Sequence, residues 1–248
     1  MKTENTNTSV ISIKGLKKSF DENHVLRDFS VELAEGENLV VLGKSGSGKS
    51  VLIKCIIGLM KPDEGNIEVF GENVMTLSHD ELDEMRVKVG FLFQSNALYD
   101  SMTIRENLEF PLRRHWDKNT QGNINDLVME ALSNVGLEST VDKMPSELSG
   151  GMQKRIALAR TLILKPKIIL YDEPTTGLDP ITGKEICHLI VDMQKKYNTS
   201  SIIISHDINC VKITANRIVM LIDGLCYATG TFEELSNSKD EKIQQFFD

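Results

Sequence analysis

A glycine-rich segment that ends in a lysine and a serine lies between a short apolar run and a helical pattern. It reads Gly43-Lys44-Ser45-Gly46-Ser47-Gly48-Lys49-Ser50 and fits the pattern G-x-x-x-x-G-K-[ST]. Backbone N–H groups at a helix N-terminus carry partial positive charge, which favours a phosphate. We expect residues 46–49 to cradle the β-phosphate of a nucleotide, Lys49 to reach the β- and γ-phosphates, and Ser50 to hold Mg²⁺. The plainer alternative is a turn whose Lys49 points to water.

A second glycine-rich turn opens another helical stretch further along the chain. It reads Leu148-Ser149-Gly150-Gly151-Met152 and leads into Ala157-Leu158-Ala159-Arg160. Its glycines and backbone N–H groups suit a phosphate in the same way, but it has no phosphate site of its own to complete. The pair therefore indicates a nucleotide that is gripped from two sides.

Two acidic residues, Asp172 and Glu173, directly follow an apolar strand pattern at residues 168–171. Open α/β sheets bind ligands at this carboxyl edge, and Pro174 helps to make the chain turn there. Asp172 can then serve Mg²⁺, while the Glu173 carboxylate is suited to orient and deprotonate an attacking water. The alternative is an exposed acidic pair that begins a loop.

Three further polar residues stand at the ends of predicted elements. Gln94 follows residues 91–93 and can ligate Mg²⁺ or a water, although many such glutamines are solvated. His206 follows the strand pattern at 202–205 and can contact a γ-phosphate and the catalytic water; taken alone, it would be a cap or surface histidine. Asp179-Pro180 fits a helix N-cap with proline at the first position, which explains both residues, and a place at a nucleotide interface is the competing hypothesis.

The composition is that of an ordinary soluble protein, with 248 residues, 26% charged residues and a formal net charge of −8. Because no long basic block is present, nucleic acid is not a favoured partner. No run approaches the ~20 apolar residues that span a bilayer, and the polar residues 1–9 lack the apolar core of a signal peptide. We expect a cytoplasmic chain whose membrane role needs a partner subunit. Its widely spaced cysteines should fill the core in a reducing compartment: Cys55, Cys187, Cys210 and Cys226.

The elements that must position these residues alternate between strand and helix patterns. Strands are predicted at 10–13, 26–33, 39–42, 65–69 and 89–93, a helix at 51–59, and a short helix after a capping box at Ser78. From about residue 95 to 164 the strand signals vanish, Thr103 and Glu106 supply another capping box, and Pro111 should kink or end a helix. Alternation then resumes with a strand at 168–171, a helix at 181–197, a strand at 201–204 and a hairpin from 217. We predict an α/β core, an N-terminal antiparallel sheet and an inserted helical subdomain.

In this order, these residues resemble the nucleotide-binding subunit of ATP-binding cassette (ABC) transporters, over nearly the whole chain. The resemblance implies a P-loop NTPase core with a RecA-like, mostly parallel sheet, an N-terminal antiparallel β-subdomain and an inserted α-helical subdomain at about 95–164. It makes residues 10–248 one ATP-binding domain, with a disordered polar segment at 1–9 and a C-terminal tail from about 236 to 248.

The resemblance also implies an ATPase with Mg²⁺, and two copies that pair head to tail. Lys49, Glu173 and His206 would be catalytic, and Ser50, Gln94 and Asp172 would hold the metal. The ATP contacts within one copy would be Phe20, which stacks on adenine, and Gly43, Lys44, Ser45, Gly46, Ser47, Gly48, Lys49, Ser50 and Val51. The other copy would supply Ser149, Gly150, Gly151 and Asp179.

A narrower resemblance, to the Mla-type phospholipid transport ATPases, rests on residues 93–113 and on Met144 to Met152. The second glycine turn ends in Met152 where most transporters carry glutamine, a departure that this lipid-transport branch shares and that we expect to slow hydrolysis. The resemblance implies a peripheral subunit on the cytoplasmic face of the bacterial inner membrane that drives phospholipid transport and maintains envelope lipid asymmetry. Its implied partners are an integral membrane permease, a lipid-binding MCE-type subunit and a small accessory subunit.

Two surfaces are candidates for partner contacts. Leu98, Tyr99 and Met102 can line a groove for a permease helix, or they can be core residues of the helical insertion. Ile243, Phe246 and Phe247 have the spacing of one helix face, and they can pack on a second subunit or on their own chain.

Other functions remain open on the sequence alone. The same fold can serve another cargo, such as an amino acid or a metal ion, or a cell-division complex. A non-transport ATPase that acts on DNA or ribosomes is disfavoured by the acidic charge and by the absence of long coiled coils or a second cassette. The last alternative is a nucleotide-sensing module without turnover.

Overall fold

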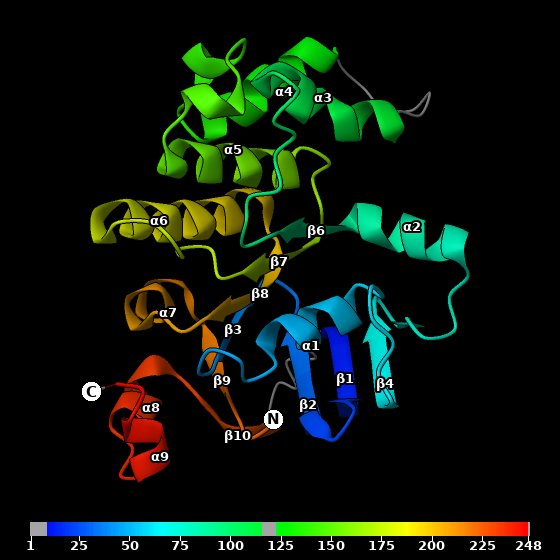
Figure 1. Cartoon of the computed structure of the whole chain (residues 1–248), viewed down its shortest axis with the longest axis vertical. Coiled ribbons are helices and arrows are strands. Elements are labelled where there is room, and N and C mark those ends of the chain that lie inside the picture. The colour runs from blue at the N-terminus through cyan, green and yellow to red at the C-terminus, as the bar shows by residue number, and fades with distance from the viewer. Residues whose placement is uncertain (1–8, 116–122, 248) are drawn as a thin grey trace, which may run out of the picture.

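The computed structural model describes residues 9–115 and 123–247 (Figure 1). Within these ranges ten strands form one curled sheet in the order β5-β4-β1-β2-β10-β9-β3-β8-β7-β6. The strands are β1 (Ser9–Phe20), β2 (Asn23–Ala34), β3 (Asn38–Leu42), β4 (Glu64–Val69), β5 (Glu72–Asn73), β6 (Val89–Leu92), β7 (Ile168–Asp172), β8 (Ser200–Ser205), β9 (Arg217–Ile222) and β10 (Leu225–Gly230). Except for Ser9, the disordered segment expected at residues 1–9 lies outside the described residues.

The sheet has a parallel part that carries the site. Strands β9, β3, β8, β7 and β6 pair in parallel, and β3 and β8 run between neighbours on both sides. Successive residues of β3 pack on opposite faces, with Leu39 and Val41 in one hydrophobic core and Val40 and Leu42 in another. This two-sided burial explains the continuous apolar runs that mark these strands in the sequence.

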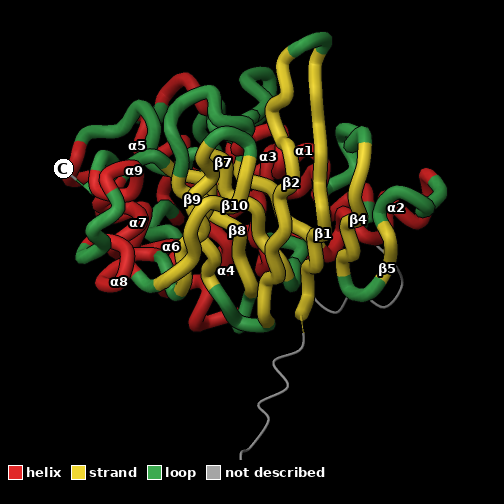
Figure 2. Tube along the Cα trace, turned by 90° about the horizontal axis from the view of Figure 1, so that it is seen from below, coloured by secondary structure: helices red, strands yellow, loops and turns green. Residues whose placement is uncertain are grey.

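The other part of the sheet is antiparallel, as predicted for the N-terminal region. Strand β1 pairs with β2 and β4, β4 pairs with β5, and β10 pairs with β9. A single parallel pair, Leu225 with Asp28, joins β10 to β2 and so connects the two parts. The β1–β2 hairpin projects beyond the rest of the molecule (Figure 2). The mixed α/β architecture with a mostly parallel core is therefore confirmed.

The helices cover the parallel strands and build a separate cluster at one end of the molecule (Figure 1). In the described ranges they are α1 (Lys49–Ile56), α2 (His79–Lys88), α3 (Ile104–Arg114), α4 (Ile124–Asn134), α5 (Gly150–Leu162), α6 (Pro180–Tyr197), α7 (Ile208–Thr214), α8 (Phe232–Ser236) and α9 (Glu241–Gln244), with short 3₁₀ turns at Glu138–Thr140 and Pro145–Glu147. Helix α1 packs in the core on one face of the sheet, and α6 and α7 pack in the core on the other. Helices α3, α4 and α5 share a third core. None of the helices in these ranges is both long and apolar enough to cross a bilayer.

Local signals in the sequence set several helix boundaries correctly. The capping boxes at Ser78 and Thr103 start α2 and α3, and Asp179 caps α6 with Pro180 at its first position. Pro111, however, does not end its helix, because α3 continues to Arg114. Proline removes only one backbone donor, and tertiary packing of Leu108 and Leu112 in the third core holds the helix across it.

The cysteines and the C-terminal aromatic residues largely pack inside their own chain. Cys55, Cys187 and Cys210 are buried, whereas Cys226 is only half-buried. Ile243 is buried, and Phe246 and Phe247 pack against the same hydrophobic core as α6 and α7. The sequence left open whether this tail packs on a second subunit or on its own chain. In this structure Ile243, Phe246 and Phe247 pack on their own chain.

Candidate functional site

The glycine-rich loop connects β3 to α1 at the carboxyl edge of the parallel strands. Gly48 stands immediately before α1 with φ 99°, a left-handed conformation that side chains with a Cβ rarely adopt. A Cβ at Gly48 would lie 2.6 Å from Cγ1 of Val25 on β2. The loop therefore requires glycine at this position, and its backbone N–H groups collect at the N-terminus of α1.

The Lys49 ammonium is buried beneath the loop that it ends. Its Nζ donates to the carbonyl oxygens of Gly43 and Lys44 at 2.8 and 3.0 Å. It also lies 3.4 Å from Oε1 of Glu173, and both side chains are less than 10% exposed. Lys49 thus points into the site rather than to water, and it holds a compact loop with its charge close to the acidic pair.

Ser50 and Asp172 meet across the gap between α1 and the end of β7. Ser50 Oγ donates to Asp172 Oδ1 at 3.0 Å. Burial raises the pKa of Asp172, and the Ser50 hydrogen bond partly opposes that effect. A hydroxyl and a carboxylate oxygen this close are hard ligands that suit Mg²⁺, which usually keeps several waters and needs few protein ligands. The pair therefore fits the metal that the sequence predicts.

Glu173 adopts a left-handed conformation, with φ 50°, at the point where the chain leaves β7. Its N–H donates to the carbonyl of Ile204 on β8 at 3.0 Å, which fixes the turn. Its carboxylate lies between two cationic or ionisable groups: Oε1 faces Lys49, and Oε2 lies 2.8 Å from Nδ1 of His206. Strained backbone at a strand end is common at functional sites, and here it aims the side chain into the loop's pocket.

A pocket of about 280 Å³ brings these groups together. It is lined by residues of the glycine loop and α1 and by side chains from three other strand ends: Val25, Ser45, Gly46, Gly48, Lys49, Ser50, Val51, Gln94, Glu173 and His206. Gln94 and His206 are far from the loop in sequence and lie beside it because β6 and β8 end at the same edge as β3 and β7. The pocket joins a phosphate cradle to a carboxylate and an imidazole, the groups that hydrolysis of a phosphoanhydride needs.

Phe20 stands at the end of β1, in the projecting hairpin. Its ring is 43% exposed, and the Lys18 ammonium lies 5.5 Å from the ring centroid. Phe20 is not among the residues that line the 280 Å³ pocket. An exposed aromatic face is free to stack on a planar base.

The second glycine turn lies away from this pocket. Ser149 caps α5 by accepting from the N–H of Met152, and Ser149, Gly150 and Gly151 are not among the residues that line the pocket. Gly150 is exposed, and a Cβ added there would meet no atom within 4 Å. A Cβ at Gly151 would lie 2.5 Å from the Thr182 methyl group. One chain therefore holds two glycine-rich helix starts, and the second does not line the pocket beside the first.

The N-cap of α6 explains the position and hydrogen bonds of Asp179. Its carboxylate accepts from the N–H groups of Ile181 and Thr182 and from the Thr182 hydroxyl, at 3.0, 3.1 and 2.6 Å. These hydrogen bonds, with the Thr182 hydroxyl foremost, lower the pKa of Asp179. Beside it, Ile181 is 75% exposed, which leaves an apolar side chain on the surface at the start of α6.

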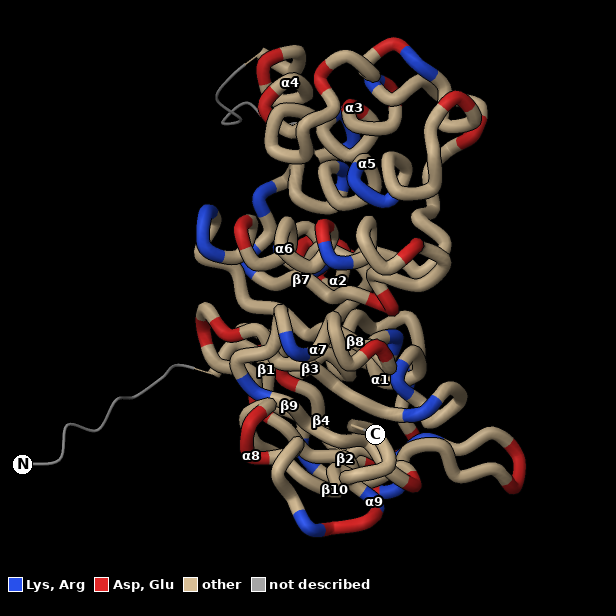
Figure 3. Tube along the Cα trace, turned by 90° about the vertical axis from the view of Figure 1, so that its left-hand side faces the viewer, with Lys and Arg blue, Asp and Glu red and all other residues tan. Residues whose placement is uncertain are grey.

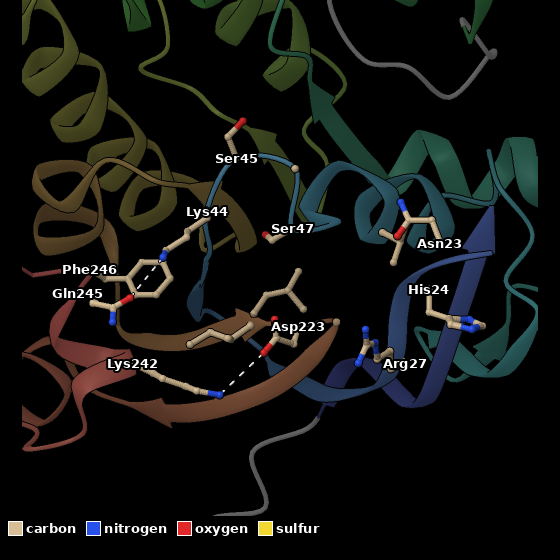
Figure 4. Close-up of a pocket in the computed structure, with 15 residues that line it drawn as sticks. Asn23, His24, Arg27, Lys44, Ser45, Ser47, Asp223, Lys242, Gln245 and Phe246 are labelled. Carbon is tan, nitrogen blue, oxygen red and sulfur yellow. Dashed lines mark hydrogen bonds and ion pairs between the residues drawn. The ribbon is translucent and has the colours of Figure 1, made fainter. Parts of the chain in front are cut away.

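A larger pocket of about 490 Å³ adjoins the glycine loop on its other side (Figure 4). It lies between the loop, β2, the β9–β10 turn and the C-terminal tail. Lys44 extends from the loop to the tail, where its Nζ lies 3.4 Å from Oε1 of Gln245 and 5.8 Å from the centroid of the Phe246 ring. The tail thus contacts the phosphate loop of its own chain.

An aromatic groove lies at the outer end of β6, between the sheet and the helical cluster. Two adjoining pockets of about 450 and 300 Å³ share Phe91, Phe93, Phe110 and Pro111. Tyr99 lines the second, with its ring centroid 5.0 Å from that of Phe110. Of the other groove candidates from the sequence, Leu98 is half-buried against two hydrophobic cores and belongs to the packing of the helical cluster.

Several residues at the site carry no signal in the sequence. Val25 touches the glycine loop, but it looks like any strand residue. Lys154 looks like a surface lysine on an amphipathic helix, yet it is 1% exposed and contacts the Gln94 carbonyl. The one available clue is that Lys154 shares the buried face of α5 with Ala157 and Leu158.

Comparison with known proteins agrees with this geometry. The family described as ABC transporter matches residues 26–176, which is more than half of the chain. "Probable ribonucleotide transport ATP-binding protein mkl" of Mycobacterium leprae is 40% identical over 236 residues, which cover 95% of this chain and 68% of that protein. "Intermembrane phospholipid transport system ATP-binding protein MlaF" of Haemophilus influenzae is 37% identical over 240 residues, which cover 97% of this chain and 90% of that protein.

Among solved structures, the ATP-binding cassette MJ0796, a dimer in a post-hydrolysis state bound to ADP and Pi, superposes with a TM-score of 0.81. It is 33% identical, and the match covers 90% of this chain and 98% of that one. The fold is therefore that of a P-loop NTPase. With its phosphate loop, its acidic strand end and its match to the family, the chain belongs to the ABC transporters, as an ATP-binding subunit that hydrolyses ATP.

Proposed function

We propose that two copies of this chain bind each ATP at the seam between them and that its hydrolysis drives a membrane permease that moves phospholipid. The observation that carries the proposal is the exposed start of α5, where Ser149, Gly150 and Gly151 lie outside the pocket that holds Lys49 and Glu173. A phosphate-binding turn with no phosphate of its own is explained when it completes the site of a second copy. The dimeric state of the ADP-bound cassette MJ0796 supports the same arrangement.

In this site each polar side chain has a distinct task. The backbone at residues 46–49 and the Lys49 ammonium bind the phosphates, and Phe20 stacks on the adenine. Ser50, Asp172 and Gln94 would hold Mg²⁺, which would neutralise phosphate charge as it develops. Glu173 accepts a proton from water as its oxygen attacks the γ-phosphorus, and the bond to the leaving ADP oxygen breaks. His206 positions Glu173 and the γ-phosphate.

Nucleotide binding must also release Glu173. The Glu173 carboxylate is shared between Lys49 and His206 at 3.4 and 2.8 Å. Phosphate oxygens compete for the Lys49 ammonium, because a phosphate binds it as a charge-assisted acceptor. Once Lys49 turns to the phosphates, one carboxylate oxygen of Glu173 is free for the attacking water. The ion pair between Lys49 and Glu173 therefore keeps the carboxylate occupied until a phosphate displaces it.

The permease is proposed to dock in the aromatic groove formed by Phe91, Phe93, Phe110, Pro111 and Tyr99. We assign residues 95–164 to a helical subdomain that carries part of this groove and the α5 turn, and residues 236–248 to a tail. The chain would then sit peripherally on the cytoplasmic face of the membrane, with a lipid-binding MCE-type subunit and a small accessory subunit in the complex. Its acidic and basic residues are interspersed along the elements, which suits a protein partner better than nucleic acid (Figure 3).

The phospholipid cargo is supported by the segments 93–113 and 144–152 and by the resemblance to the protein MlaF, which the match covers to 90% of its length. A ribonucleotide is the second candidate cargo, because the mkl protein is named for ribonucleotide transport and is 40% identical. Affinity purification from membranes, followed by mass spectrometry of the bound small molecules, separates the two. Phospholipid enriched in the wild-type complex over an unrelated membrane complex supports the first candidate. A ribonucleotide other than ATP or ADP, without such lipid enrichment, supports the second.

The decisive test of the ATP seam uses Glu173→Gln, which keeps the size and a hydrogen bond but cannot take a proton. We expect the hydrolysis rate to fall by about 10²-fold or more, while ATP is still bound and the mass in light scattering doubles when ATP and Mg²⁺ are added. Glu35→Gln, at an exposed position remote from the pocket, is the control and should behave as wild type. If Glu173→Gln hydrolyses ATP at the wild-type rate, or stays monomeric with ATP bound, the proposal is wrong.

A further inference from the structure

The segment 94–99 connects the nucleotide pocket to the aromatic groove. Gln94 lines the pocket beside Lys49 and Glu173, and Tyr99 lines the groove beside Phe110. Between them, Asn96 and Ala97 both adopt left-handed conformations, with φ 63° and 52°. Two consecutive non-glycine residues in this region are costly unless their surroundings hold them. The segment is therefore a strained connection that something else must fix.

The first restraint is Lys154 on α5. Its side chain is 1% exposed, and its Nζ donates to the backbone carbonyl of Gln94 at 2.9 Å. Burial lowers the pKa of Lys154 to about 8, although the nearby Asp172 favours the charged form. A buried ammonium is costly, and an apolar side chain of similar size would be the cheaper filling for this position. The hydrogen bond to the Gln94 carbonyl offsets part of this cost.

The second restraint is Arg160, less than two helical turns further along α5. Its guanidinium donates to the carbonyls of Asn96 and Ala97 at 3.3 and 2.7 Å, the two residues with strained backbone. It also lies 5.6 Å from the centroid of the Tyr99 ring. A rigid planar donor of this kind can fix two carbonyls at once, which a lysine cannot do equally well.

A third contact comes from Asn107 on α3, which is fully buried. Its side-chain amide donates to the carbonyls of Tyr99, Met102 and Thr103 and accepts from the Tyr99 N–H at 2.8 Å. Arg160 also reaches Asn107 Oδ1 at 3.4 Å. Asn107 therefore fixes the groove end of the segment, while α5 fixes the pocket end and the middle.

We propose that Lys154 and Arg160 are positioning residues for ATP hydrolysis, which tie Gln94 and the strained segment behind it to the helix that begins with the second glycine turn. The turn at Ser149 and Gly150 contacts the ATP of the other copy; this part of the inference rests on the proposed function. Lys154, on the next turn of α5, holds the Gln94 of its own site. One rigid helix thus connects the two sites. When ATP binds against the start of α5, a displacement of that helix shifts Gln94 in the neighbouring site.

Kinetics of Lys154→Met in the full-length chain with ATP and Mg²⁺ test the first contact. Methionine fills a similar volume without the ammonium, so we expect the melting temperature to stay or rise, while kcat falls by about 10-fold or more and KM for ATP changes little. Lys154→Arg keeps the donor and should recover part of kcat. Arg155→Met is the matched control, because Arg155 is adjacent on α5 but bonds Glu185 and Val135 instead of the segment. Wild-type kcat in folded Lys154→Met would overturn the proposal.

Hydrogen–deuterium exchange without nucleotide gives a readout that does not depend on turnover. We expect faster exchange at residues 95–99 in Lys154→Met and Arg160→Lys than in Arg155→Met, with the α5 amides unchanged. Equal exchange in all three variants would overturn the proposed tether even if activity changed. If wild type stays monomeric with ATP and Mg²⁺ while the exchange difference and the loss of kcat are present, the proposed seam fails but the tether stands.

Discussion

At the scale of single residues, the site is defined by charged and polar side chains that contact one another in pairs or triads. Lys49, Glu173 and His206 form one such group, and Ser50 with Asp172 forms another. Isolated buried charges are costly, so each group is held by the hydrogen bonds of its partners. Phosphate and metal must compete with these contacts during binding.

Asp172 gives a prediction about pH. Its pKa in the folded chain lies above the ordinary value, chiefly because of burial. The folded state therefore holds this proton more tightly than the unfolded chain, and the contribution of Asp172 to stability is lost as pH rises through the raised pKa. Asp172→Asn should therefore increase the free energy of unfolding at pH 8 without nucleotide, and the increase should shrink as pH falls towards 4, near the ordinary pKa of this carboxyl group.

Urea unfolding at both pH values measures this effect, with the exposed Asp192→Asn on α6 as the control. Added ATP and Mg²⁺ should reverse the order, because wild type gains the binding energy of the metal complex and Asp172→Asn gains less. An Asp172→Asn variant that is less stable than wild type at both pH values without nucleotide would contradict the assigned effect of burial.

At the scale of elements, the start of α3 decides where the groove residues stand. Thr103 caps the helix and Glu106 closes the box, and the loop before them carries Tyr99. Thr103→Ala removes the side-chain acceptor and should lower the free energy of unfolding by about 1 kcal/mol, whereas Thr103→Ser keeps the hydroxyl and should cost much less. Denaturant titration of the three chains checks this order. Equal losses in the two variants would mean that the threonine methyl, rather than the cap, supports the helix.

At the scale of the whole molecule, substitutions at the start of α5 can change dimer formation without changing the stability of the single chain. A Cβ at Gly150 meets nothing within the chain, whereas one at Gly151 meets Thr182 at 2.5 Å. Gly150→Ala should therefore leave the melting temperature unchanged or slightly higher, since alanine is the better helix former by up to about 1 kcal/mol. In the Glu173→Gln background it should weaken the ATP-dependent dimer, because the added methyl group enters the seam beside phosphate.

Light scattering with ATP and Mg²⁺ measures the dimer. Gly183→Ala on α6 is the control for a helical glycine without a positive φ, whose added Cβ would make only an ordinary contact, 3.6 Å from Thr175. Gly151→Ala, unlike Gly150→Ala, should also lower the melting temperature, because its added methyl group would clash with Thr182. If Gly150→Ala dimerises as readily as its parent, the seam does not include this turn, and the second helix start needs another explanation.

The C-terminal tail shows how the whole molecule adds contacts that no motif contains. Phe247 packs edge-on against Phe232 with ring centroids 5.5 Å apart, and Gln245 and Phe246 contact Lys44 in the phosphate loop. The tail therefore stabilises the outer side of the loop in the nucleotide-free chain. Figure 4 places Lys44, Gln245 and Phe246 across the larger pocket from Arg27 and His24.

The sequence by itself determined the features that depend on short-range patterns. The phosphate loop, the capping boxes at Ser78 and Thr103, and the apolar strands buried on both faces all follow from residues close together in the chain. It also predicted that polar residues at strand ends would gather, because parallel strands present their carboxyl ends at one edge. Gln94, Glu173 and His206 do line one pocket with the loop.

Only the tertiary structure decided which partner each of these side chains meets. It paired Glu173 with both Lys49 and His206, buried Lys154 against Gln94, carried α3 past Pro111, and laid the C-terminal tail on its own chain. Periodicity reveals which face of an element is buried but not what packs against it. Those contacts join residues distant in sequence, and their energies depend on burial and geometry that exist only once the sheet and helices have assembled.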